Sequence, residues 1–492
     1  MPMRIEDLLE KRERAIYLLV ERLRDSRSSL SLKGLSQELA LSRTTLIRYI
    51  ESFDEQVRQA NLGLSFQVRE EEVSYERKDS LLRADWIAYL CQFSTKYQIL
   101  LYLFDREEFA IQALAQHLLI SEASLNRQLA ALNLLLQDFQ ISIRNGRFKG
   151  SELQIRYFYY QLFLQTKTLS RVRTCPHFRQ IASYLPLFER FFDTKFNPRQ
   201  ALQLSLWLGI SQRRMRGQDV DFSDLIQLMK SYIQQKWYQE LRSFALTLSQ
   251  YQPSIVREGE VMSLFAFLVS QSILAPQKVE RILAFGGPIR EATTWCYQTI
   301  REELGHQLPI HEQILYYLNQ LLGSVYFFKG SLEAPVPHGN QCQLTSARSL
   351  LSTVLEKIYQ PQSPSLVFQY EEEVTNLAGL FDYLSQVQPV VVRIGFISCL
   401  SPIIADPILY QLQREFERKH AVVIEPFSAS SDYDLLISDE PELVDVPFYS
   451  FYRRLSASDL LALKKTIAQL QEQKEKQTHR FLKASIFSIE RR

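Results

Sequence analysis

Two short stretches of the sequence carry side chains suited to hydrogen bonding with nucleic-acid bases and phosphates. These side chains are Arg43, Thr44, Thr45 and Arg48 in the first stretch, and Ser124, Asn126 and Arg127 in the second. An arginine fork matches the O6 and N7 acceptors of guanine, and an asparagine amide matches N6 and N7 of adenine. The chemistry expected of these residues is therefore base and phosphate recognition.

Both stretches belong to a pattern that the chain uses twice, 79 residues apart and without a gap. Leu35–Ile50 reads LSQELALSRTTLIRYI, and Leu114–Leu129 reads LAQHLLISEASLNRQL. Each copy predicts a short helix, a tight turn and a longer helix. Ser42 and Ser121 are suited to cap the second helix, and apolar residues recur every four positions behind the outward side chains.

The repeated pattern predicts a helix-turn-helix, whose second helix enters the DNA major groove. The first helices are expected at Leu32–Ala40 and Phe109–Leu119, and a further helix over Met1–Leu30 should pack behind the first pair. Two ordinary helical hairpins with solvated arginines are the alternative. Two copies in one register, each followed by a pair of strands, favour DNA binding.

A strand pair is expected after each copy. The alternation over Leu64–Tyr75 predicts the first, with an acidic tip at Glu70–Glu72 that would repel phosphate. Asn145-Gly146 within Ile141–Gly150 predicts the second, with a type I′ turn. Its basic residues are Arg144, Arg147 and Lys149, with Arg156 just beyond. A basic hairpin after a recognition helix is typical of a winged helix that touches phosphates, and a solvated basic turn is the alternative.

Composition narrows the class of protein. Of the 492 residues, 46% are hydrophobic and 23% are charged, which is typical of a globular protein with three to five domains. No apolar run approaches a membrane-spanning length. The five cysteines are scattered, with no metal-ligand spacing, which fits a reducing cytoplasm and predicts no metal or cofactor. The net charge of +2 means that DNA affinity must come from local patches.

The pattern changes along the chain predict a mainly α, multidomain fold. Dense aromatics at helical spacing indicate packed helical cores in the middle of the chain. Strands alternating with helices after Pro389 predict a parallel sheet. The expected domains are two winged helix-turn-helix domains at 1–80 and 81–156, two helical modules at 157–274 and 275–386, and an α/β domain at 387–492.

This order of parts resembles the Mga/AtxA family of Gram-positive virulence regulators over essentially the whole chain. The most telling stretch is Phe148–Gln165, FKGSELQIRYFYYQLFLQ, where a wing strand leads into the first helical module. The resemblance implies that the helical modules are similar to phosphotransferase regulation domains (PRDs) and the last domain to the EIIB component of sugar phosphotransferase systems. It implies a cytoplasmic, homodimeric regulator that binds double-stranded DNA and activates virulence or surface-protein genes, with no enzymatic activity.

The resemblance also implies possible phosphorylation sites. PRD histidines accept phosphate from the phosphocarrier HPr. The candidates within the two modules are His177, His306, His311 and His338, of which His177 and His311 are selected, while Trp207 stands in the neighbourhood where such a histidine is expected. Cys399 follows the first strand of the last domain, at about the place of the EIIB phosphocysteine. Its loop, SCLSPIIADP, has no glycine for a backbone N–H cradle, so a role in dimerisation or sensing is expected. A phosphocarrier using Cys399 and a PRD-type antiterminator are the alternatives.

Overall fold

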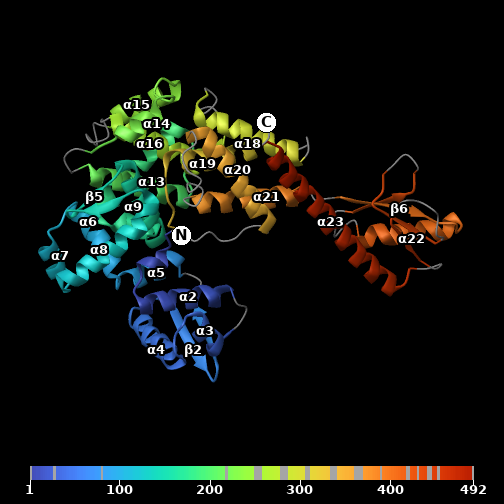
Figure 1. The fold of residues 1–492 in the computed structure, drawn as a ribbon, viewed down its shortest axis with the longest axis horizontal. Helices are drawn as coiled ribbons and strands as arrows, with labels where there is room; N and C mark the ends of the chain where they lie inside the picture. The colour runs from blue at the N-terminus through green and yellow to red at the C-terminus, as the bar shows by residue number, and fades with distance from the viewer. Residues whose placement is uncertain are drawn as a thin grey trace. The chain divides into compact units, whose positions relative to one another are not determined.

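The computed structural model describes residues 3–25, 29–78, 81–215, 220–248, 258–276, 286–304, 311–332, 341–359, 370–387, 391–416, 422–428, 432–439, 446–451 and 455–489 (Figure 1). Over these residues the chain is mainly α-helical with three small sheets, so the mainly α, multidomain fold class is confirmed. One compact unit comprises Met1–Trp295, Glu312–Val336 and Val354–Glu373, and the other comprises Cys296–His311, Pro337–Thr353 and Val374–Arg492.

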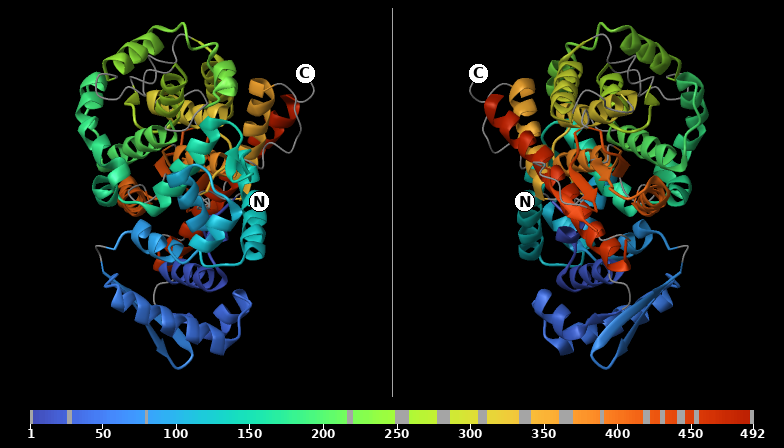
Figure 2. Two further views of the ribbon diagram at one scale, coloured as in Figure 1. Left: turned by 90° about the vertical axis from the view of Figure 1, so that its left-hand side faces the viewer. Right: turned by 90° about the vertical axis from the view of Figure 1, so that its right-hand side faces the viewer.

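The region that contains the first repeat copy forms several helices and an antiparallel sheet. Its elements are α1 (Ile5–Leu8), α2 (Lys11–Asp25), β1 (Leu30–Ser31), α3 (Leu32–Glu38), α4 (Arg43–Gln59), β2 (Leu64–Arg69) and β3 (Glu72–Arg77), with strand order β1-β3-β2. Figure 2 shows the long β2–β3 hairpin in blue. The single helix expected over Met1–Leu30 is wrong, because extended backbone at Leu9 separates α1 from α2.

The second repeat copy has the same order of a helix pair and a hairpin. Its elements are α5 (Arg83–Cys91), α6 (Thr95–Arg106), α7 (Ile111–His117), α8 (Glu122–Leu136), a 3₁₀ turn at Gln137–Phe139, β4 (Ser142–Arg144) and β5 (Arg147–Lys149). Asn145 and Gly146 have φ values of 52° and 72°, as a type I′ turn requires. The Ser94 hydroxyl donates to the Leu8 carbonyl oxygen at 2.5 Å, which ties the second copy to the first.

The two interhelical turns have the same backbone hydrogen bonds. In the first, the Leu41 N–H donates to the Ser36 carbonyl at 3.0 Å and the Ala40 N–H to that of Gln37 at 3.3 Å. In the second turn, the Ile120 N–H donates to the Ala115 carbonyl at 3.0 Å and the Leu119 N–H to that of Gln116 at 3.2 Å. This is the Schellman motif, which places Ala40 and Leu119 in the left-handed region at φ 51° and 55°. The first helices therefore end at Glu38 and His117, two residues earlier than expected.

Helix α9 (Glu152–Thr166) continues the chain from the second hairpin into the helical module. Every residue of α9 except Leu164 is buried, and the helix packs against α5 and α13 (Pro198–Arg214). The domain boundary expected after residue 156 therefore falls inside this helix.

Arg156 lies at the centre of a buried ion-pair network. Its side chain has no exposed surface, and its guanidinium donates to both carboxylate oxygens of Glu260 at 2.6 and 2.7 Å and to Glu152 at 2.9 Å. Arg214 donates to the other oxygen of Glu152 at 2.7 Å. Although Arg156 follows the basic hairpin in the sequence, its buried side chain is not part of the exposed basic surface of that hairpin.

The middle of the chain is built from helices. They are α10 (Leu169–Thr174), α11 (Pro176–Arg179), a 3₁₀ turn at Gln180–Ser183, α12 (Leu185–Phe192), α13, α14 (Ser223–Met229), α15 (Lys236–Leu248), α16 (Glu258–Ser270), α18 (Pro288–Leu304), α19 (His311–Phe327), α20 (Gln341–Tyr359) and α21 (Glu371–Val387). Trp207 stacks on Phe267 with ring centroids 4.4 Å apart, and Tyr157 stacks on Phe328 at 4.3 Å. These rings are buried, so they pack the core and do not present faces to bases.

The C-terminal part forms the parallel α/β arrangement expected from its alternating pattern. Its elements are β6 (Val392–Ile397), α22 (Pro402–Phe416), β7 (Val422–Pro426), β8 (Leu435–Ser438), β9 (Phe448–Ser450) and α23 (Ala457–Ile489). The strand order is β7-β6-β8-β9, with all neighbours parallel. Among the described residues, no helix is both long and apolar enough to cross a membrane.

Two glycines of the repeat copies should respond oppositely to substitution by alanine. A Cβ at Gly146 would lie 1.9 Å from the Phe109 carbonyl oxygen, and its φ is +72°, whereas a Cβ at Gly34 in α3 meets nothing within 4 Å. We expect Gly146→Ala to lower the free energy of unfolding by about 2 kcal/mol or more, because left-handed backbone and the clash add. Gly34→Ala should raise it by about 1 kcal/mol through helix propensity. Urea denaturation of both variants measures this, and a Gly146→Ala protein as stable as the parent would contradict it.

Candidate nucleic-acid interface

The N-terminal turn of α4 presents the side chains expected to face outward. Ser42 caps the helix: its Oγ accepts the Thr45 N–H at 3.2 Å and lies 2.7 Å from the Thr45 hydroxyl. Arg43, Thr44 and Arg48 are exposed, and Thr45 is half-buried. On the opposite face, the fully buried Leu46 and Ile50 anchor α4 to the core. The helix thus offers hydroxyls and guanidinium groups to a groove from a rigid base.

Arg43 is held by the acidic tip of the first hairpin. One of its terminal nitrogens lies 2.7 Å from a Glu71 carboxylate oxygen, and the other donates to the Glu70 carbonyl at 3.0 Å. The two side chains remain 47% and 62% exposed, and an ion pair of that exposure contributes roughly 0–1 kcal/mol. A DNA phosphate can therefore replace Glu71 at small cost. The acidic tip is visible in the sequence, but its pairing with Arg43 is not, because hairpin length and twist set that distance.

Helix α8 presents a less constrained set of polar groups. Ser121 Oγ accepts the Ser124 N–H at 3.2 Å, the same cap as in α4. Ser124 is half-buried, while Asn126 and Arg127 are exposed and have no side-chain partner among the described residues. Leu125 is fully buried behind them. This helix therefore places an amide and a guanidinium outward without an internal competitor.

The second hairpin places three cations at the surface. Arg144, Arg147 and Lys149 are all exposed. Arg147 Nε donates to the Glu108 carboxylate at 2.5 Å, and the Phe109 N–H donates to the Gly146 carbonyl at 3.0 Å. These bonds fix the hairpin against the segment just before α7. No local pattern in the sequence marks Glu108 as a partner of Arg147, although its place directly before the helix expected at Phe109–Leu119 is a weak signal.

The expected phosphorylation sites differ in what the structure shows. The side chains of His177 and His311 lie outside the described residues, as do His306 and His338. Cys399 is exposed at the end of β6, where its N–H donates to Asp439 Oδ1 at 2.9 Å and the Ser398 hydroxyl donates to Oδ2 at 2.7 Å. Partial burial opposes ionisation of Asp439, but these donors hold its pKa below the ordinary value. The carboxylate uses N–H groups that a phosphocysteine would need, and it would repel phosphate.

One family model matches the part of the chain that contains the second repeat copy. Residues 80–163 match the family model of the Mga helix-turn-helix domain. The matched stretch runs from the start of α5 through α8 and the second hairpin into α9. No curated protein matches the chain. The family match supports a Mga-like regulator and indicates a DNA-binding function in transcription.

Removing the acid that holds Arg43 should strengthen binding to DNA. We expect Glu71→Gln to raise affinity for duplex DNA about two- to five-fold, because it releases Arg43 and removes a negative charge from the hairpin tip. Glu55→Gln is the matched control, since Glu55 is exposed twelve residues further along the chain from Arg43. Fluorescence anisotropy with a labelled duplex measures both. Equal effects of the two variants would show that affinity for DNA responds only to net charge, and not to release of Arg43 from Glu71.

Proposed function

We propose that this chain regulates transcription by binding double-stranded DNA through α4 and α8 as recognition helices. The observation that carries the proposal is the repeated geometry. Both copies have the same Schellman turn, the same serine cap on the third N–H of the second helix, and an outward polar face followed by a hairpin. This agreement, position by position, supports two copies of one motif over two unrelated helical hairpins. The arrangement fits insertion of the second helix into a major groove.

The proposed roles follow from the side-chain types and their exposure. Arg43, Thr44, Thr45 and Arg48 would contact one groove, and Ser124, Asn126 and Arg127 another. Arg144, Arg147 and Lys149 would contact phosphates from the second hairpin. We propose that α4 contributes more to base recognition, because it carries two arginines, whereas the second copy has the more basic hairpin.

The proposal includes the finer properties implied by the family resemblance. These are activation of virulence or surface-protein genes, action as a homodimer and absence of enzymatic activity. A dimer would present its recognition helices to two half-sites, and a chromosomal target implies a cytoplasmic location. Regulation by HPr through the sugar phosphotransferase system is also proposed, by way of the PRD-like modules. The Asp439 carboxylate against the Cys399 backbone supports a non-catalytic role for the EIIB-like domain.

Loss of either recognition arginine should weaken specific binding. We expect Arg48→Ala and Arg127→Ala each to lower affinity for a cognate promoter duplex about 5- to 100-fold, because a bidentate base contact contributes roughly 1–3 kcal/mol of discrimination. Arg58→Ala is the control: Arg58 is exposed at the far end of α4 and pairs with Asp54 at 2.6 Å. Binding is measured by titration at constant salt, with unfolding curves for each variant. Unchanged affinity for both Arg48→Ala and Arg127→Ala would refute the proposal.

A further inference from the structure

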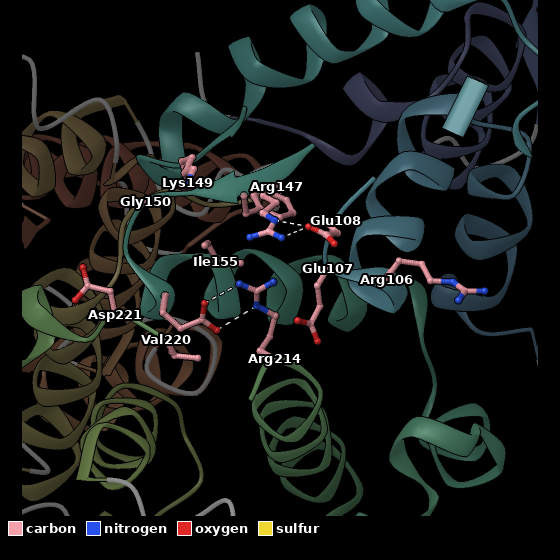
Figure 3. Close-up of a pocket in the computed structure, with 12 residues that line it drawn as sticks. Arg106, Glu107, Glu108, Arg147, Lys149, Gly150, Ile155, Arg214, Val220 and Asp221 are labelled. Carbon is pink, nitrogen blue, oxygen red and sulfur yellow. Dashed lines mark hydrogen bonds and ion pairs between the residues drawn. The ribbon is translucent and has the colours of Figure 1, made fainter. Parts of the chain in front are cut away.

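A pocket of about 600 Å³ lies below the second hairpin, between β5, the first turn of α9 and the end of α13 (Figure 3). Its volume is within the range of small-molecule sites, roughly 300–1,000 Å³. Phe148, Ile155 and Val220 supply its apolar surface. The remaining lining is dominated by charged side chains, so charge decides what kind of ligand the pocket can hold.

The pocket contains equal numbers of positive and negative side chains. The cations are Arg106, Arg147, Lys149 and Arg214, and the acids are Glu107, Glu108, Glu152 and Asp221. Figure 3 shows Arg147 and Arg214 extending from β5 and α13 toward the same space, with Glu107 and Glu108 beside them, while Arg106 points away. A polyanion entering this space would be repelled by the four carboxylates, and a polycation would be repelled by the four cations. Electrostatic complementarity therefore favours a ligand that carries both signs.

The floor of the pocket is fixed before any ligand binds. Arg214 and Glu152 form a pair at 2.7 Å with side chains only 13% and 6% exposed, and Glu152 is also held by Arg156. Burial opposes the charge on Glu152, but Arg214 and Arg156 hold its pKa below the ordinary value, so it stays ionised. The outer pair, Arg147 with Glu108, is 62% and 57% exposed and can exchange partners. A rigid floor and an exchangeable rim are suited to ligand capture.

Three charges of the pocket are incompletely neutralised. Lys149 has no ion-pair partner within the part of the chain that the structure describes. Glu107 has its nearest cation, Arg213, only at 3.7 Å. Asp221 accepts the Ser223 N–H at 2.8 Å, and this bond lowers its pKa, so it is a carboxylate. The pocket thus offers an ammonium group at the hairpin and two carboxylates for a ligand of matching charges.

We propose that this pocket binds a small zwitterion of the amino-acid or short-peptide class. Its carboxylate would be held by Arg147 and Lys149, and its ammonium group by Glu107, which lies beside Arg147 in Figure 3. Occupancy would engage the two hairpin cations and weaken their contact with DNA phosphates. That consequence rests on the proposed function, whereas binding of the zwitterion does not.

The test uses three chemically matched pools of random tripeptides with the full-length protein. One pool is unmodified, one is N-acetylated so that only the carboxylate remains, and one is C-amidated so that only the ammonium remains. Saturation-transfer difference NMR should give at least three-fold stronger signals from the unmodified pool. Glu107→Gln should reduce those signals to the level of the acetylated pool or below. Asp224→Asn, an exposed acid three residues from Asp221 that does not line the pocket, should leave them unchanged.

Other outcomes overturn the proposal. No signal from the unmodified pool, or signals of equal strength from the acetylated pool, would exclude a zwitterion site. An Asp224→Asn effect as large as that of Glu107→Gln would exclude this pocket as its location. Duplex titration in the presence of the unmodified pool should show two- to five-fold weaker binding, and undiminished affinity would overturn the link to DNA. Peptide binding by a protein that binds no duplex would refute the proposed function and leave the pocket assignment in place.

Discussion

The salt bridges of Arg156 are the interaction on which the rest of this architecture depends. Arg156 is fully buried and satisfied only because Glu260 receives two of its N–H groups and Glu152 a third. Removing one partner of a buried pair typically costs about 3–5 kcal/mol, since a charge is left without compensation. The network joins α9 to α13 through Glu152 and Arg214, and to α16 through Arg156 and Glu260, so a shift of α9 along either helix would break these pairs. Only Gly150 and Ser151 separate β5 from α9, so the position of α9 also constrains where the hairpin lies.

A second constraint acts at the surface, where acids hold the arginines that would contact DNA. Glu71 forms an ion pair with Arg43, and Glu108 forms one with Arg147, and both pairs are exposed. Such pairs exchange readily, so DNA competes with the protein's own carboxylates for these groups. With a net charge of only +2, the chain has no broad positive field to attract non-specific DNA. This arrangement favours binding where base contacts from α4 and α8 add to the phosphate contacts.

Much of the fold could be predicted because it is governed by local signals. The spacing of Ser42 and Ser121, the Asn145-Gly146 turn and the strands after Pro389 each act within a few residues, and the corresponding elements are found there. The burial of Arg156 depends on Glu260, which is 104 residues away, and no local pattern reports such a distance. Glu152 and Arg156 do stand four residues apart on one helix, which is a weak signal for pairing. The pairing of Arg43 with Glu71 depends on hairpin geometry and was likewise beyond sequence reasoning.

The most direct test of the account is a titration of the full-length protein against duplex DNA from its own upstream region, beside a random duplex of equal length. The measurement is repeated at several salt concentrations. Recognition of bases and phosphates through α4, α8 and the second hairpin predicts tighter binding to the upstream duplex. It also predicts a linear fall of the logarithm of affinity with the logarithm of salt, with a slope of about 0.9 for each phosphate contacted. Absence of binding to both duplexes at low salt would contradict it.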